Sequence, residues 1–219
     1  KEHPQMVIEI PGSIGTRGAI KAVVDKEIPL GLISRSLKEE EKGLGITEVP
    51  YAQVAIVIAA HPRVTDENIT TGELIAIIEG KKNRWQNGSE IIVHVREKSD
   101  SGFLVLENII PGFKEAYAKS HEAKRWTVYF TDQDANEALA STPFAIGLTD
   151  LGMISTEQLP VKVLKLNGVA PSPENLRNGS YPLSRQLSFV YNKENLPEEV
   201  KSFMYFVFSD TGRKILQAN

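Results

Sequence analysis

Apolar residues along the chain fall into short strand-like runs that alternate with helical stripes. The run 51–60 is apolar on both faces, as expected of a strand buried between layers of helices. The segment 70–80 has a helical pattern, because Thr70 and Glu73 are spaced as a capping box and Gly80 follows the last apolar position as a stop signal. Strands and helices alternate in this way through the sequence, which predicts an α/β fold.

The chain is expected to form two lobes. The apolar strand 51–60 and a second strand at 187–191 are placed to carry the chain from one lobe to the other and back. The first lobe is predicted to comprise residues 1–60 and 183–219, and the second residues 61–182. Such a layout leaves a cleft between the lobes, which is where small ligands commonly bind.

Composition excludes several classes of protein. The 25 Lys and Arg residues are balanced by 28 Asp and Glu residues, so no general basic surface is available for nucleic acid. With no cysteine, the chain has no disulfide, thiolate nucleophile or Cys-ligated metal site. The longest apolar run, 54–60, is far shorter than the roughly 20 residues of a membrane span. We therefore predict a protein that neither binds nucleic acid nor is embedded in a membrane.

Patterns typical of enzymes are weak in this sequence. The four histidines lie in unrelated contexts, and no two of them have the spacing of metal ligands. The nucleophile elbow of hydrolases, the zinc-protease motif and the glycine-rich loop of nucleotide hydrolases are all missing from the sequence. The sequence favours a binding protein over an enzyme, and no cofactor or metal is predicted.

Three segments offer the groups that bind oxyanions, namely backbone N–H groups at a helix start, hydroxyls and guanidinium groups. The first is 15–18, where Thr16 is expected to cap a helix. The second is Arg96 at the end of a strand, followed by a Ser-Gly turn at 101–102 that opens a helix. The third is 34–36, after another strand. Each segment also has a plain structural interpretation, as a capped turn or as a solvated arginine beside a helix cap.

Taken in order, these segments and their neighbours resemble a known family. The segments that carry the resemblance are 14–21, 31–37, 74–81 with Trp85, 95–96 with 101–102, 145–148, 168–175, 181–183 and 209–212. They are similar to the substrate-binding proteins of phosphate ABC transporters, which are two-lobed periplasmic binding proteins of type 2. The resemblance covers nearly the whole chain. It implies a type 2 periplasmic-binding-protein fold, in which each lobe is a mixed sheet flanked by helices and a cleft lies between the lobes.

The resemblance also implies a set of ligand-binding residues. Thr16 matches the family's hydroxyl at the start of its second helix, and Arg96 matches the arginine that clamps the ligand. Ser34 stands where some members place an aspartate that accepts the proton of phosphate, and other members have a serine before arginine as here. The implied ligand-binding set is Thr16, Arg17, Ser34, Arg96, Ser101 and Gly102.

Two departures from the family pattern affect this expected site. One extra residue separates Arg96 from Ser101, and Phe103 replaces the family's threonine. We expect Phe103 to remove a donor and to narrow or reshape the pocket, and Asp100 to oppose an anion. Replacement polar contacts are expected at the start of the next helix but one, from Gln133, Asp134 and Asn136.

The function implied by the resemblance is capture of phosphate or a related tetrahedral oxyanion, outside the cytoplasm, for the permease of an ABC transporter. The location implied is periplasmic, or extracellular and membrane-associated, and the expected state is a monomer. The alternative, favoured by Phe103 and the extra residue, is a sensory or interaction domain that keeps the fold with a degenerate ligand site. Family members begin with a further strand, loop and helix, and segment 1–4 matches the last turn of that helix. This sequence is therefore expected to lack one wall of the site.

Overall fold

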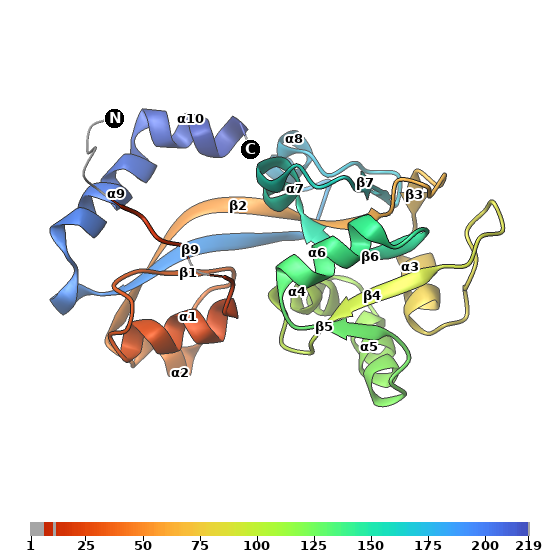
Figure 1. The fold of residues 1–219 in the computed structure, drawn as a ribbon, viewed down its shortest axis with the longest axis horizontal. Helices are drawn as coiled ribbons and strands as arrows, with labels where there is room; N and C mark the ends of the chain where they lie inside the picture. Colours follow the sequence, from red (N-terminus) through yellow and green to blue (C-terminus); the bar gives the residue numbers. More distant parts are fainter. Residues whose placement is uncertain (1–6, 11, 219) are drawn as a thin grey trace. The chain divides into compact units, whose positions relative to one another are not determined.

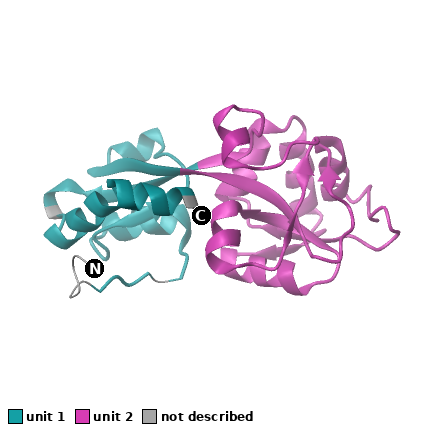
Figure 2. Cartoon of the chain, turned by 90° about the horizontal axis from the view of Figure 1, so that it is seen from above, with its two compact units in different colours: residues 1–52, 186–219 teal, residues 53–185 magenta. Residues whose placement is uncertain are grey.

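The computed structural model describes residues 7–10 and 12–218, so segment 1–4 lies outside the described residues. The chain forms two compact units, which Figure 2 shows in teal and magenta. Unit 1 comprises residues 1–52 and 186–219, and unit 2 comprises residues 53–185. The divisions fall inside two long strands, β2 (Ile46–Ala60) and β9 (Ser184–Asn192), and not at residues 60 and 183 where the sequence places them. Each of these strands therefore contributes to both units.

The described part of unit 1 is built on the strands β1, β9 and β2, which lie in that order. β1 (Gly31–Ile33) pairs antiparallel with β9, so that Gly31 lies opposite Val190. A Cβ atom on Gly31 would lie 2.8 Å from a methyl group of Val190, so glycine is what allows these two strands and the first helix to pack closely. The helices of unit 1 are α1 (Gly15–Val24), α2 (Glu39–Lys42), α9 (Glu198–Phe208) and α10 (Asp210–Ala218), with a 3₁₀ turn η1 at Lys193–Asn195.

Unit 2 contains a mixed sheet in the order β2-β6-β4-β5, with β7 (Lys162–Val163) pairing with β2. β6 (Ala145–Asp150) is antiparallel to β2 but parallel to β4 (Ile92–Arg96), which in turn is parallel to β5 (Thr127–Tyr129). The short strands β3 (Asn68–Ile69) and β8 (Lys165–Leu166) form a separate parallel pair. The helices of this unit are α3 (Thr71–Ile78), α4 (Ser101–Ile109), α5 (Phe113–Glu122), α6 (Asp132–Ser141), α7 (Leu151–Glu157) and α8 (Pro173–Arg177) (Figure 1).

The core of unit 2 follows the hydrophobic pattern of the sequence. Residues 55–60 of β2 are at most 1% exposed, as the pattern apolar on both faces predicts. α3 begins with the predicted capping box, in which Thr70 accepts the N–H of Glu73 and Glu73 binds back to Thr70. α5 packs against both α3 and α4, and α6 packs against β4, β5 and β6. The predicted α/β class with mixed sheets and flanking helices is thus confirmed.

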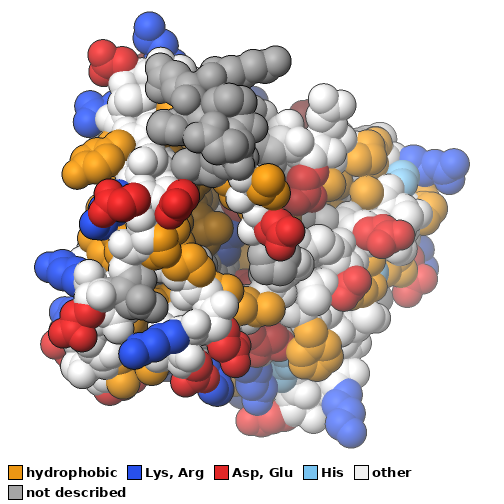
Figure 3. Space-filling model, turned by 60° about the vertical axis from the view of Figure 1, so that its left-hand side comes forward, with side chains coloured by type: hydrophobic (Ala, Val, Ile, Leu, Met, Phe, Trp, Pro, Cys, Tyr) orange, Lys and Arg blue, Asp and Glu red, His pale blue; other side chains and the backbone are white. Residues whose placement is uncertain are grey.

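The surface of unit 1 carries several large hydrophobic side chains. They include Leu32, Leu44, Tyr205, Phe206, Ile215 and Leu216. On the face that Figure 3 shows, hydrophobic side chains stand among charged ones. Within the described residues, no helix is both long enough and apolar enough to cross a membrane.

Candidate anion-binding site

The candidate site in unit 2 lies where three parallel strands end. β4 ends at Arg96, β5 at Tyr129 and β6 at Asp150, and each strand is followed closely by a helix, α4, α6 and α7 respectively. Because the carboxyl ends of parallel strands lie at one edge of a sheet, the starts of these helices come together there. This edge is the usual ligand position in open α/β sheets.

Arg96 occupies the centre of this edge and is buried. Its side chain is 10% exposed, and its Nε atom lies 3.4 Å from Oδ2 of Asp100 and 3.5 Å from Oδ1 of Asp132. The backbone carbonyl of Arg96 accepts the hydroxyl of Tyr117 at 2.5 Å, which fixes the end of the strand. The sequence prediction that Arg96 lies beside the Ser-Gly turn of α4 agrees with this geometry.

Arg185 is a second buried guanidinium at the same edge, and the sequence analysis missed it. It donates from Nη1 to the hydroxyl of Ser101 at 2.8 Å and from Nη2 to Asp150 at 2.5 Å. Asp150 also accepts the N–H of Met153 and so caps α7. In the sequence, Arg185 lies two residues before the predicted strand 187–191, and this position indicates neither its burial nor its partners.

Arg96, Arg185 and three carboxylates form what we call the charged cluster, which consists of Arg96, Asp100, Asp132, Asp150 and Arg185. Within the described part of the chain, Nη1 of Arg96 and Nε of Arg185 are buried and have no hydrogen-bond partner. Buried N–H groups normally have partners, so these two donors indicate that a further acceptor belongs here. A small oxyanion has the required acceptor atoms.

In the charged cluster, burial and neighbouring charges have opposite effects on the pKa values of Asp132 and Arg185. Burial raises the pKa of Asp132, and the nearby Arg96 and Arg185 partly offset the effect. For Arg185, burial lowers the pKa, but Asp150 and Asp132 more than compensate and the pKa is raised. Arg185 therefore stays charged, and Asp132 gains a proton more easily than an ordinary aspartate.

Asp100 occupies the amide donors that the sequence analysis assigned to a ligand. Its Oδ1 atom accepts the N–H groups of Gly102 at 2.9 Å and Phe103 at 3.1 Å. Asp100 is thus the N-cap of α4, and the same carboxylate pairs with Arg96. A carboxylate thus already lies on the groups that would bind an anion, and the expectation that Asp100 opposes an anion stays a prediction.

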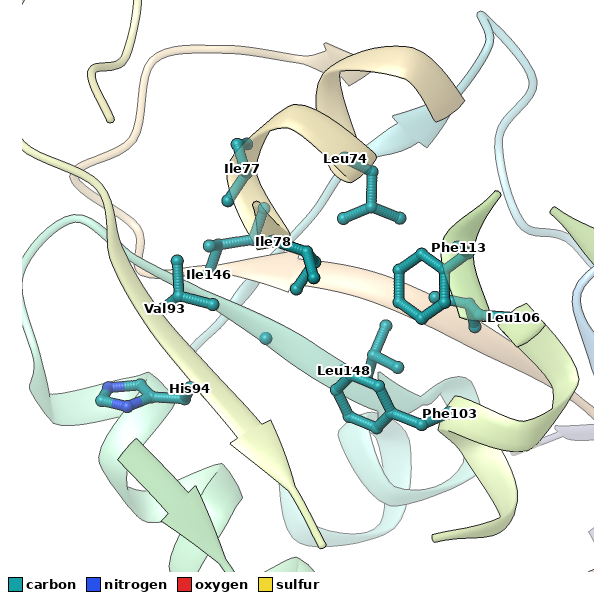
Figure 4. Close-up of a pocket in the computed structure, with 11 residues that line it drawn as sticks. Leu74, Ile77, Ile78, Val93, His94, Phe103, Leu106, Phe113, Ile146 and Leu148 are labelled. Atoms are coloured by element: carbon teal, nitrogen blue, oxygen red, sulfur yellow. The ribbon is translucent and has the colours of Figure 1, made fainter. Parts of the chain in front are cut away.

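Phe103 does not lie where the sequence analysis expected it. Its ring is 2% exposed and stacks on Tyr117, with ring centroids 4.5 Å apart, and also lies near Phe113. Figure 4 shows it pointing into the apolar interior beside Leu148. Phe103 is on the buried face of α4, so its ring does not narrow the charged edge. As expected from the sequence, its side chain supplies no donor there. The pocket that it lines has a volume of about 20 Å³, enough for about one water molecule, and its walls are almost entirely apolar.

The predicted replacement contacts from α6 are also placed differently. Gln133 and Asp134 are exposed, and Asn136 is buried with its amide 3.7 Å from the sulfur of Met153. The residue of α6 that reaches Arg96 is Asp132, one position earlier. The predicted helix start at Thr131 is confirmed, because this hydroxyl accepts the N–H of Asp134.

Thr16 and Ser34 of unit 1 lie together, and their membership of one binding set stays a prediction. Their hydroxyl oxygens are 3.2 Å apart, and Ser34 also donates its N–H to Thr16. Thr16 does not cap α1, however, because the N-cap is Ile14 and makes no side-chain bond. Arg17 is exposed. Arg35, which follows Ser34 in the sequence, donates from both of its Nη atoms to the carboxylate of Glu41, and this ion pair lowers the pKa of Glu41 to about 2.

The side chains at the charged edge are guanidinium, carboxylate and hydroxyl groups, which can form hydrogen bonds and ion pairs. Within the described residues, no group of three or more His, Asp or Glu side chains is placed to hold a metal ion.

Comparison with known proteins identifies the family. Residues 1–211 match the model of the PBP superfamily domain. The chain belongs to this family. A protein from Clostridium perfringens described as a phosphate ABC transporter substrate-binding protein, with bound phosphate, is 28% identical. The match covers 98% of this chain and 86% of that chain, with a TM-score of 0.83.

Curated relatives are consistent with this assignment. Phosphate-binding protein PstS of Borreliella burgdorferi is 24% identical over 93% of this chain and 75% of its own length. Phosphate-binding protein PstS of Staphylococcus epidermidis is 27% identical over 97% of this chain and 69% of its own. The resemblance and the type 2 binding-protein fold predicted from the sequence are confirmed.

Proposed function

We propose that this chain binds phosphate or a closely related tetrahedral oxyanion and delivers it to the permease of an ABC transporter. Binding, and not catalysis, is proposed because the described residues at the charged edge offer donors and charges, and no nucleophile among them is paired with a base. The relatives described as phosphate-binding proteins support this assignment. The site of action proposed is outside the cytoplasm, and monomeric behaviour stays a prediction.

The observation that carries the proposal is the buried guanidinium of Arg96. Its Nη1 atom has no partner within the described residues, and it lies beside the start of α4 at the carboxyl edge of a parallel sheet. A charge-assisted hydrogen bond contributes about 1.5–3 kcal/mol, and micromolar affinity corresponds to about 8 kcal/mol. Arg96 and a few neutral donors are therefore sufficient for micromolar affinity. Ser101 and Gly102 belong to the proposed set, and Thr16, Arg17 and Ser34 of unit 1 are proposed as further members.

Titration calorimetry with inorganic phosphate tests the proposal. We expect the unaltered chain to bind, and Arg96→Ala to lose more than about a hundredfold in affinity, because a buried charge partner is removed. Arg84→Gln is the matched control, since the side chain of this exposed arginine donates, among the described residues, to the carbonyl of Gly88 and not to the charged cluster. Thermal unfolding of each variant establishes that it is folded. Equal affinity of Arg96→Ala and the unaltered chain would exclude the charged edge as the site.

A second candidate function is a sensory or interaction domain with a degenerate ligand site. The observation that favours it is Asp100, whose carboxylate already holds the amides of Gly102 and Phe103 and pairs with Arg96. A thermal-shift screen with phosphate, arsenate, sulfate and molybdate distinguishes the two functions. A rise in melting temperature with any of these anions supports transport-type binding, and no rise with all four supports the second candidate.

A further inference from the structure

Arg185 connects three segments that are distant in sequence. Its side chain, from β9, donates to Ser101 at the first position of α4 and to Asp150 at the N-cap of α7. The arginine and Asp150 side chains are only 12% and 7% exposed. One guanidinium thus holds a residue of the proposed ligand-binding set and a buried carboxylate at the same time.

We propose that Arg185 is a positioning residue of the anion site, which fixes the hydroxyl of Ser101 so that it donates to the bound oxyanion. The proposal rests on the proposed function, and it assigns to Arg185 a role in affinity that is exerted through Ser101 and not by contact with the ligand.

The chemistry of the two side chains dictates the direction of the bond between them. A guanidinium has donors only, so the oxygen of Ser101 must be the acceptor in its bond with Arg185. The hydroxyl therefore directs its own proton elsewhere, and its rotation is restricted. Because hydrogen bonds polarise one another, donation from a cation also makes the hydroxyl a stronger donor. An oxyanion at the charged edge is the acceptor that benefits most.

Arg185 also prevents Asp150 from acting as a competing anion. Without a cation beside it, this carboxylate, whose side chain is 7% exposed, would be a buried, uncompensated charge close to Ser101. The bond of Asp150 to the N–H of Met153 leaves one carboxylate oxygen for Arg185. Arg185 therefore engages the second oxygen of Asp150, so that this carboxylate does not compete with the ligand for hydrogen-bond donors.

A purely structural explanation accounts for less of this geometry. A pair made for stability alone needs only Arg185 and Asp150, and apolar residues often serve as well in such positions. The bond from Nη1 to Ser101 is additional to that pair. It places the guanidinium one hydrogen bond away from a residue of the proposed site.

The test is a thermodynamic cycle, measured by phosphate titration calorimetry on the full chain. The double substitution Arg185→Gln with Asp150→Asn removes the guanidinium without leaving an unpaired carboxylate, and Asn keeps the cap of α7. We expect this change to weaken phosphate binding by about tenfold to a hundredfold, the effect of losing one charge-assisted hydrogen bond. In a chain that also carries Ser101→Ala, the same change is expected to weaken binding by no more than about twofold.

Two further variants make the outcome decisive. Arg185→Lys keeps the charge but cannot bind both Ser101 and Asp150 in the same way, so we expect a partial loss with Ser101 present and none with Ser101→Ala. Arg84→Gln should leave affinity unchanged. Equal losses with and without Ser101 overturn the proposal, as does unaltered affinity of the Arg185 variants. Failure of the unaltered chain to bind phosphate overturns the proposed function as well, which distinguishes the two failures.

Discussion

Asp100 and Arg96 form an ion pair in which Oδ2 of the carboxylate lies 3.4 Å from Nε of the guanidinium. The other oxygen of Asp100 accepts the N–H groups of Gly102 and Phe103. The carboxylate thus makes, within the chain, the contacts that an oxyanion would make with a guanidinium and a helix start. A ligand must compete with Asp100 or use the remaining donors of Arg96.

The first prediction follows from this competition. Asp100→Asn removes the negative charge but keeps an oxygen that can cap α4, because Asn and Asp are comparable N-caps. We expect phosphate affinity to rise by about tenfold, which corresponds to about 1.4 kcal/mol of lost repulsion. Calorimetry at low ionic strength, where the effect is greatest, is the measurement. Asp25→Asn is a control, since this carboxylate pairs with Lys21 on the exposed side of α1. A weaker binding of phosphate by Asp100→Asn would show that Asp100 supports the ligand instead of opposing it.

The second prediction concerns Asp132 and pH. Burial raises the pKa of Asp132, and Asp100 and Asp150 add to the effect while Arg96 and Arg185 oppose it. An added anion raises this pKa further, so binding takes up a proton and affinity increases as pH falls. Sulfate is the suitable probe because it keeps its own charge between about pH 7.5 and about pH 5.

The comparison is between the unaltered chain and Asp132→Asn. We expect sulfate affinity of the unaltered chain to increase several-fold over that interval and the affinity of Asp132→Asn to change little. At about pH 7.5 the variant should bind sulfate more tightly, because one carboxylate has been removed. A pH dependence that is the same in both chains would assign the titration to another group of the cluster.

The fold was predictable because its signals are local and repeated. The residues 55–60 are buried on both faces of β2, and the Thr70–Glu73 capping box begins α3, as the sequence pattern indicates. The order of the motifs predicted the family, and Arg96 was correctly placed at a strand end before the helix that starts at Ser101. These features depend on neighbours in sequence, or on a pattern that extends along the whole chain.

The partners within the site were not predictable in the same way. Arg185 meets Ser101 across 84 positions and Asp150 across 35, and no local pattern specifies such pairs. Phe103 was assigned to the ligand pocket by its place in a motif, but the turn of the helix directs its ring inward. On α6, the residue that reaches Arg96 is Asp132, which lies one position before the expected Gln133 and two before Asp134.

The third prediction tests the place of Phe103. Because its ring stacks on Tyr117 and packs in the core, Phe103→Leu should lower the free energy of unfolding by about 1–2 kcal/mol. Phosphate affinity should stay within about twofold of the unaltered chain. Urea denaturation gives the first quantity and calorimetry the second. A large gain in affinity without a loss of stability would mean that the ring obstructs the ligand.

The last prediction concerns His94, which lies on β4 two residues before Arg96. Its ring is 7% exposed and meets Tyr129 edge-on at 5.2 Å, and within the described residues neither ring nitrogen has a hydrogen-bond partner. Burial lowers its pKa, so the folded chain holds the ring neutral where the unfolded chain begins to bind a proton.

The sign of the resulting pH dependence is fixed. A depressed pKa in the folded state gives stability that is present above the unfolded value of about 6.5 and is lost as pH falls below it. We expect the urea midpoint of the unaltered chain to fall between about pH 7.5 and about pH 5, and His94→Leu to fall less. The urea midpoint of His61→Gln over the same pH interval is compared with that of His94→Leu. His61 is more exposed than His94, and its pKa is also lowered, by burial and by Arg63. A midpoint for His94→Leu that falls as steeply as that of the unaltered chain would mean that protonation of other groups drives the loss.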